Sequence, residues 1–157
     1  MPHRRVITGV ANGNEVVIDD AQMETLDLDG VQVTPIWQIG DIPTVPTDGS
    51  WREGVGFPDP GGLWMCTFTV PPHRTVEIGG DIIEFDKTRR GFHCTDSVDV
   101  DFVLGGEITF EIDDGSEVVL RAGDTIVVNG TRHAWHNRTD EPVTIMSTVY
   151  GARRNAS

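Results

Sequence analysis

Apolar and polar residues alternate with a period of two along most of this chain, which is typical of β-strands that cover one face. Glycine-containing turns separate the short runs at regular intervals, as at Asn12-Gly13, Asp114-Gly115 and Asn129-Gly130. No segment of any length shows the 3.6-residue period of an amphipathic helix. The pattern therefore predicts an all-β fold, either a sandwich or a barrel.

The start of the chain predicts a hairpin followed by an edge strand. Residues 5–10 and 15–18 are β-rich runs joined by Asn12-Gly13, a dipeptide that tolerates the positive φ angles of a tight turn. Residues 31–39 form an apolar run interrupted by Pro35. Because proline cannot donate a ladder hydrogen bond, this run suits the edge of a sheet or a bulge.

Residues 41–62 contain four prolines and five glycines without a strand or helix period, so we expect a long loop. Long loops inside a compact domain often close over a binding pocket. Trp51, Arg52 and Phe57 are the side chains in this loop with which it would do so. The alternative is that the loop is an arm packed on a neighbouring subunit. After it, residues 63–70 alternate as a strand, and weaker apolar runs surround Gly79-Gly80.

The run from Gly91 to Glu107 carries the most distinctive chemistry of the chain. On an extended strand, one side would present His93, Thr95, Asp99 and Asp101. The opposite side is continuously apolar, which favours a central strand, and if both faces are covered the histidine and the aspartates lie inside the protein. Histidine and carboxylates at even spacing can hold a metal ion or transfer protons.

A second stretch of this kind follows the Asn129-Gly130 turn. His133, Trp135 and Asn137 share one face of the expected strand, while His136 points the other way. The forty positions between His93 and His133 hold several hairpins, a separation that brings two strands side by side in an antiparallel barrel. The sequence therefore predicts one site built by both stretches.

Composition limits the partners that this site can serve. A chain of 157 residues is long enough for one domain with a sizeable core. The net charge of −13 would repel both nucleic acid and an anionic membrane. Two cysteines without metal-like spacing, no apolar signal peptide and no run of membrane-spanning length favour a soluble, cytoplasmic protein that binds neither.

The two stretches resemble the paired motifs of the cupin superfamily. The first motif is matched by His93, Thr95, Asp99 and Gly106, with threonine and aspartate where the family has histidine and glutamate. The second is matched by Gly123, Gly130, His133 and Asn137, one residue short and with Val128 in place of a proline. The resemblance implies a single-domain, cupin-like jelly-roll β-barrel with an N-terminal strand extension. Residues 91–150 would form the core, and residues 1–90 would complete the barrel within one domain, 1–157.

Cupin metal sites typically use three histidines and a glutamate, so the resemblance implies a divalent metal held here by His93, Asp99 and His133. This is formally the 2-His-1-carboxylate set of non-haem iron enzymes, and Fe, Mn, Zn and Ni all remain open, as does a site without metal. Asp99 is shorter than glutamate by one methylene, so its oxygen would fall about 1.5 Å short unless the backbone shifts, against a bond of about 2.0–2.2 Å. A bridging water or Asp101 would have to fill the gap.

Three functions follow from these observations. The first is a metal-dependent enzyme on a small organic molecule, of the lyase or dehydratase, isomerase or dioxygenase type. The second is a metal-free enzyme in which Asp99, His93 and His133 perform acid–base catalysis. The third is a non-catalytic small-molecule-binding module. We expect an enzyme, with a substrate pocket lined by the side chains of Thr95, Asp101, Trp135, Arg132 and Trp51.

We also expect a homodimer. Cupins commonly pair, and the N-terminal strands with the 41–62 arm present more sheet edge than one small barrel needs.

Overall fold

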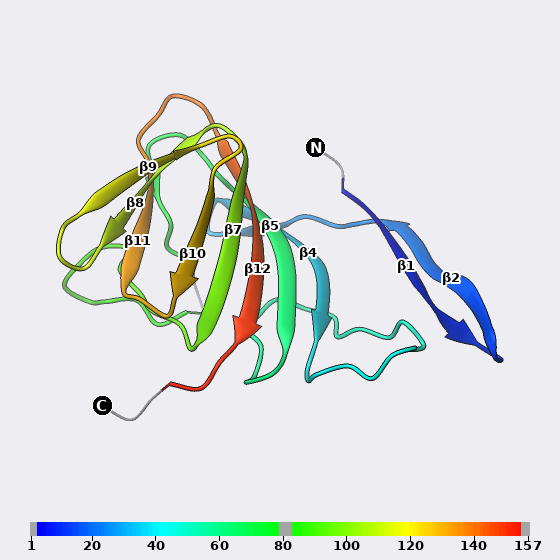
Figure 1. The fold of residues 1–157 in the computed structure, drawn as a ribbon. Helices are drawn as coiled ribbons and strands as arrows, with labels where there is room; N and C mark the ends of the chain where they lie inside the picture. Colours follow the sequence, from blue (N-terminus) through cyan, green and yellow to red (C-terminus); the bar gives the residue numbers. More distant parts are fainter. Residues whose placement is uncertain (1–2, 79–82, 155–157) are drawn as a thin grey trace.

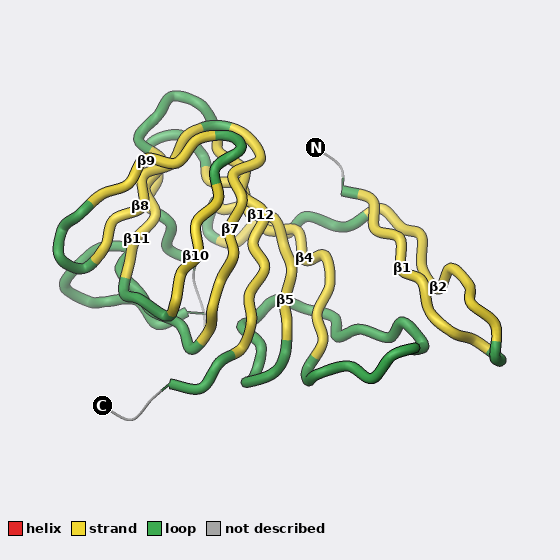
Figure 2. The backbone as a smooth tube through the Cα atoms, in the orientation of Figure 1, coloured by secondary structure: helices red, strands yellow, loops and turns green. Residues whose placement is uncertain are grey.

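The computed structural model describes residues 3–78 and 83–154, and its described part consists of strands and loops (Figures 1 and 2). The all-β prediction is confirmed, although part of the expected apolar segment around Gly79-Gly80 lies outside the described residues. In the described residues no helix has the length and apolar character needed to span a membrane. The strands are β1 (Arg4–Ala11), β2 (Asn14–Gln22), β3 (Leu26–Leu28), β4 (Val31–Ile39), β5 (Leu63–Val70), β6 (Arg74–Thr75), β7 (Ser97–Gly105), β8 (Glu107–Ile112), β9 (Glu117–Arg121), β10 (Thr125–Asn129), β11 (His133–Asn137) and β12 (Val143–Gly151).

Two antiparallel sheets enclose the core of the barrel. The larger sheet has the order β10-β7-β12-β5-β4-β3, and the smaller has the order β6-β11-β8-β9. Strands distant in sequence are neighbours in both, because connections cross from one sheet to the other, as in a jelly roll. Fully buried side chains such as Val70, Ile108, Val143 and Ile145 fill the space between the sheets.

Strand β7 is central, as predicted, because it pairs with β10 on one side and with β12 on the other. Its polar side chains face the interior, and its apolar face points outward. Val100 is 37% exposed and Leu104 is 45% exposed, so the apolar face of β7 is partly open to solvent, while His93 and the aspartates lie inside the protein. The buried polar face thus places two carboxyl groups, those of Asp99 and Asp101, inside the barrel.

The run from Gly91 to Glu107 is not one continuous strand. Strand β7 begins only at Ser97, and His93 forms isolated bridges with Phe85 and His133. The chain therefore leaves the smaller sheet at His93 and enters the larger sheet at Ser97. This crossing lets one segment contribute polar groups from both walls of the barrel.

The predicted N-terminal hairpin is confirmed as β1 and β2, which form a separate two-stranded sheet projecting from the barrel (Figure 1). Asn12 and Gly13 have φ angles of 52° and 78°, as a tight turn requires. The 41–62 segment is a loop, as expected, and its Thr47 carbonyl accepts a hydrogen bond from the Val10 amide of the hairpin. The run with Pro35 is β4, which lies between β5 and β3, so the alternative of an edge strand is wrong. The alternative of a bulge is confirmed by a register shift between Pro35 and Trp37.

Gly106 turns the chain from β7 into β8 with a φ of 86°. A Cβ there would lie 2.8 Å from the Pro142 carbonyl oxygen, whereas at Gly115, with φ 85°, it would meet nothing within 4 Å. Gly115→Ala is expected to cost about 1–2 kcal/mol from backbone conformation alone. Gly106→Ala should lower the free energy of unfolding by about 1–3 kcal/mol more than Gly115→Ala, because the added methyl group also overpacks the turn. Urea unfolding of the two variants measures this difference, and equal losses would show that the close approach at Gly106 is relieved without cost.

The homodimer remains a prediction, and exposed apolar residues locate its expected interface. Val6 and Val17 on the hairpin are 51% and 60% exposed, and an isolated two-stranded sheet is marginal in water. On the outer face of the larger sheet, Val127 and Tyr150 are 52% and 50% exposed. We expect sedimentation to show a dimer that Val17→Asp dissociates, while Val119→Asp on β9, at a site 42% exposed, leaves it intact. A monomeric wild-type chain would contradict the prediction.

Candidate active site

A pocket between the two sheets contains the polar groups that the sequence singled out. Its cavity volume is about 60 Å³, and its mouth opens to solvent. Four aromatic side chains, Phe57, Trp64, Phe68 and Trp135, form much of its wall. Its polar members are His93, Asp99, Asp101, His133 and Ser147. The two distant sequence stretches therefore do meet at one hollow.

Backbone hydrogen bonds fix the two histidines against each other. The amide of His93 donates to the carbonyl of His133, and the reverse bond is also made, both at 3.0 Å. Their ring centroids lie 4.5 Å apart. Phe85 packs edge-on against the first ring at 5.1 Å, and Phe110 stacks on the second at 4.8 Å. Both imidazoles are thus held in place by a bridge and by aromatic neighbours.

Hydrogen bonds to backbone carbonyls set the tautomer of both rings. Nδ1 of His93 lies 3.0 Å from the Gly91 oxygen, and Nδ1 of His133 lies 2.8 Å from the Thr131 oxygen. Because a carbonyl oxygen only accepts, each Nδ1 carries the proton and each Nε2 is left as the acceptor. Both rings therefore offer a basic nitrogen.

Burial keeps the two imidazoles neutral. It lowers the pKa of His93, against a smaller opposing effect from the Gly91 carbonyl. It lowers the pKa of His133 to about 4, and the neighbouring His93 adds to this shift. At neutral pH both rings are in the neutral form with the Nε2 lone pair free, and the same desolvation makes them weaker bases than a free imidazole.

The two aspartates enter the pocket from adjacent inward positions of β7. Asp99 is 8% exposed and Asp101 is 4% exposed, and Oδ1 of each is buried without a hydrogen-bond partner. Burial raises the pKa of Asp99, and a hydrogen bond with Ser97 partly offsets it. Burial raises the pKa of Asp101 to about 7, reduced by a hydrogen bond with Ser147 and increased by Asp99. A carboxyl group with its pKa raised in this way can act as a proton donor near neutral pH.

Cys66 of β5 also lines this pocket. In the larger sheet, Ser147 of β12 pairs with Cys66 on one side and with Asp101 of β7 on the other. Burial raises the pKa of its thiol, with further contributions from Asp101 and then Asp99. A buried neutral thiol is inert, so Cys66 serves as a wall of the pocket rather than as a nucleophile.

The metal site implied by the motif does not fit this donor arrangement. In the chain from residue 3 to 78 and from 83 to 154, no three His, Cys, Asp or Glu side chains are grouped closely enough to hold one ion. His93 and His133 are neighbours, but Asp99 does not complete a set of three with them. Glutamate would reach further into the pocket than Asp99 by one methylene, which is the difference that the sequence anticipated.

The remaining residues predicted for the pocket are divided between four places. Asp101 and Trp135 line it, as expected. The Thr95 hydroxyl instead pairs with that of Ser97 at 2.7 Å, outside the lining. Trp51 lies in a separate cleft, where the Arg5 guanidinium sits 4.3 Å from the centre of its ring. The expected closing loop reaches the barrel pocket through Phe57.

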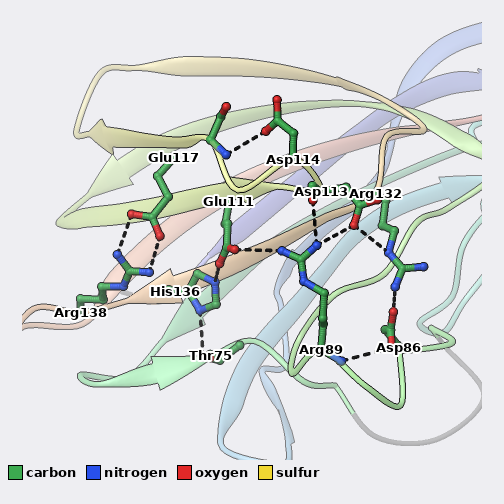
Figure 3. Close-up of polar contacts among 11 residues, drawn as sticks. Thr75, Asp86, Arg89, Glu111, Asp113, Asp114, Glu117, Arg132, His136 and Arg138 are labelled. Carbon is green, nitrogen blue, oxygen red and sulfur yellow. Dashed lines mark hydrogen bonds and ion pairs between the residues drawn. The ribbon is translucent and has the colours of Figure 1, made fainter.

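Arg132 belongs to an ion-pair cluster on the outside of the smaller sheet (Figure 3). It contacts Asp86 and Asp113, and Arg89 bonds Asp113 at 2.7 Å and Glu111 at 3.0 Å. His136 also faces this cluster, with Nε2 3.0 Å from Glu111, so it points away from the pocket as predicted. The cluster ties the segment carrying Phe85 to β8 and β11.

Sequence reasoning did not assign Trp64, Cys66 or Ser147 to the site, although all three line the pocket. The alternation of residues 63–70 had already placed Trp64, Cys66 and Phe68 on one face. The alternation did not indicate which of the two faces of this strand turns into the barrel. The pairing of β5 with β12 in the larger sheet shows this.

Comparison with known proteins shows which sequences and folds this chain resembles. The family model described as "Cupin domain" matches residues 82–149. Phomopsin biosynthesis cluster protein C' of Diaporthe leptostromiformis is 38% identical over 75 residues, 45% of this chain and 39% of that protein. Oryzines biosynthesis cluster protein J of Aspergillus oryzae is 32% identical over 63 residues, 38% of this chain and 35% of that protein. The similarity thus spans less than half the length of these relatives.

Solved structures share the fold at low identity. The cupin domain of Schizosaccharomyces pombe Cnp3 has a TM-score of 0.56 at 8% identity, covering 94% of this chain and 87% of that one. An RmlC-like cupin from Shewanella frigidimarina has a TM-score of 0.52 at 17% identity, covering 84% of this chain and 86% of that one. Residues 82–149 thus match a cupin domain, and the chain as a whole has the fold of these cupin structures.

Proposed function

We propose that this protein is an enzyme that converts a small organic molecule by proton transfer between its own side chains and the substrate. Two relatives named for biosynthesis clusters support a role in small-molecule metabolism. The reaction class that we infer is dehydration or isomerisation. Neither requires an electron acceptor or a second substrate.

One observation carries the proposal: two proton-accepting nitrogens and two carboxyl groups with unpartnered oxygens line the same largely apolar pocket. Buried polar atoms without partners are costly in a folded protein, so their retention favours a functional role. A structural role would be served better by groups whose hydrogen bonds are complete, as Asn137 shows. Its amide donates to the carbonyls of Val70, Pro71 and Glu141.

The four groups supply complementary roles in a dehydration. Nε2 of His93 or His133 removes a proton from a substrate carbon, and the Asp101 carboxylic acid gives its proton to the hydroxyl on the neighbouring carbon. The C–H and C–O bonds break, a carbon–carbon double bond forms, and the hydroxyl leaves as water. The imidazolium then returns its proton to the Asp101 carboxylate. Aromatic walls exclude bulk water, which would otherwise compete for these protons.

Deuterium incorporation tests this proposal even while the natural substrate is unidentified. A panel of small enolisable ketones, β-hydroxy ketones and their amino analogues is incubated with the protein in D₂O and followed by NMR. We expect enzyme-dependent deuterium at carbon, with a rate that falls about 10²–10⁴-fold in Asp101→Asn, the usual contribution of a general acid or base. Asp114→Asn, at an exposed hairpin, is the matched control. Exchange that is unaffected by Asp101→Asn would refute the role of this carboxyl group.

The raised pKa of Asp101 predicts that the free energy of unfolding depends on pH. This pKa rises from the ordinary value of 3.8 to about 7 on folding, so the unfolded chain releases this proton first and stability falls as pH rises between these values. At about 1.4 kcal/mol per pH unit, the shift corresponds to up to about 4 kcal/mol. Relative to wild type, Asp101→Asn should therefore gain stability between pH 4 and pH 8, as measured by urea unfolding. A gain that does not change with pH would show that Asp101 is already ionised in the fold.

Metal dependence separates this proposal from the metal enzyme that the motif implies. With the donors arranged as they are, protein purified without a His-tag is expected to hold no stoichiometric transition metal, and EDTA should not reduce deuterium incorporation. His93→Ala is the matched variant for elemental analysis. A stoichiometric ion in wild type that is lost in His93→Ala would overturn the metal-independent mechanism.

A further inference from the structure

The barrel pocket has an unusual balance of charge. Its lining includes two carboxyl groups, Asp99 and Asp101, and neither a lysine nor an arginine among the described residues. Arg132, which was expected to line the pocket, lies in the outer ion-pair cluster, and Arg52 of the 41–62 loop lies in the separate cleft. A ligand in this pocket thus meets negative or neutral polar groups.

The unpartnered atoms specify what the ligand must provide. Oδ1 of Asp99 and Oδ1 of Asp101 are both buried, and both accept hydrogen bonds when ionised. A ligand carboxylate or phosphate would bring further negative charge into an apolar space where no cation of the described lining compensates it. A ligand with only acceptor atoms would leave Asp99 unsatisfied. An ammonium group supplies three donors and a positive charge together.

The walls are suited to the same group. Aromatic faces attract cations, and Trp64, Trp135, Phe57 and Phe68 line the pocket around the carboxyl groups. The protein as a whole carries a net charge of −13, which raises the local concentration of cations near its surface. An inorganic cation would be coordinated less well, because no three ligating side chains come together among the residues that the structure describes.

We propose that the molecule bound in this barrel carries a protonated amine, which the carboxylate of Asp99 binds. This inference rests on the proposed function and assigns its substrate class. Asp99 is the less buried of the two residues, 8% exposed against 4% for Asp101. Asp101 and the two imidazoles remain available for proton transfer on the carbon atoms next to the amine. Asp99 is then a specificity-determining residue rather than the proton donor.

Three probes of one shape test this assignment: phenethylamine, 2-phenylethanol and phenylacetate. They share the ring and differ at neutral pH in carrying a positive, neutral or negative end group. By calorimetry on the full chain, we expect the amine to bind at least about tenfold more tightly than the alcohol, the equivalent of about 1.4 kcal/mol, and phenylacetate not to bind. A stronger affinity for the alcohol or for phenylacetate, or no binding of the amine, would overturn the inference.

Two variants test whether Asp99 causes the preference for the amine. Asp99→Asn keeps the shape of the side chain and removes its charge, so it should reduce amine affinity to that of the alcohol and leave alcohol binding within about twofold. Asp114→Asn makes the same change in net charge at an exposed hairpin and should leave the amine preference intact. An amine preference that survives Asp99→Asn would overturn the assignment. Circular dichroism confirms that each variant is folded.

Two further readouts separate this inference from the proposed function. Stoichiometric binding of Mn²⁺ or Zn²⁺ that is lost in Asp99→Asn would show that an inorganic cation occupies the carboxylates and would overturn the amine. If deuterium incorporation depends on Asp101 but amines have no advantage in binding, the amine inference fails while the proton-transfer function holds. If amines bind through Asp99 and no compound in the panel exchanges, the function fails while the binding class stands.

Discussion

Strand β7 occupies a central position in the larger sheet, and this constraint governs the site. Because β10 and β12 use its backbone hydrogen bonds on both sides, its alternate side chains must point either outward or into the barrel. Asp99 and Asp101 are on the inward set, where few donors are available to them. The raised pKa of each carboxyl group and the polar character of the pocket follow from that placement.

The bridge between His93 and His133 complements this constraint from the opposite wall. It consists of backbone hydrogen bonds, so the main chain brings the two residues together, and the contact between their rings and with Phe85 and Phe110 adds to this. Carbonyls of Gly91 and Thr131 then orient the rings and direct Nε2 away from the backbone. A pocket with preset acceptors facing carboxyl groups is pre-organised for proton transfer, since little rearrangement is needed when a substrate enters.

Charge is distributed very differently outside the barrel. On the smaller sheet, Arg89, Arg132 and Glu111 join a network of ion pairs on the surface (Figure 3). Such exposed pairs contribute little to stability individually, but several together fix the segment that carries Phe85 against β8 and β11. The protein thus places these arginines where they organise the outer surface, away from the carboxyl groups of the interior.

Much of this protein could be predicted from its sequence, because strand alternation and turn chemistry are local properties. The period of two placed His133, Trp135 and Asn137 on one face, and Asn12-Gly13 marked the hairpin, since each depends only on adjacent residues. The motif spacing indicated the barrel and the meeting of His93 with His133. Local pattern also grouped Asp99 with Asp101.

Only the tertiary structure shows how far Asp99 reaches and which side chains from other strands complete the pocket. These depend on sheet order, on register and on the distance across the barrel, none of which a local pattern encodes. For this reason Arg132 and Trp51 lie outside the pocket despite their chemistry. The sequence by itself determined the fold and the types of group at the site, and packing between distant strands determined their geometry and charge.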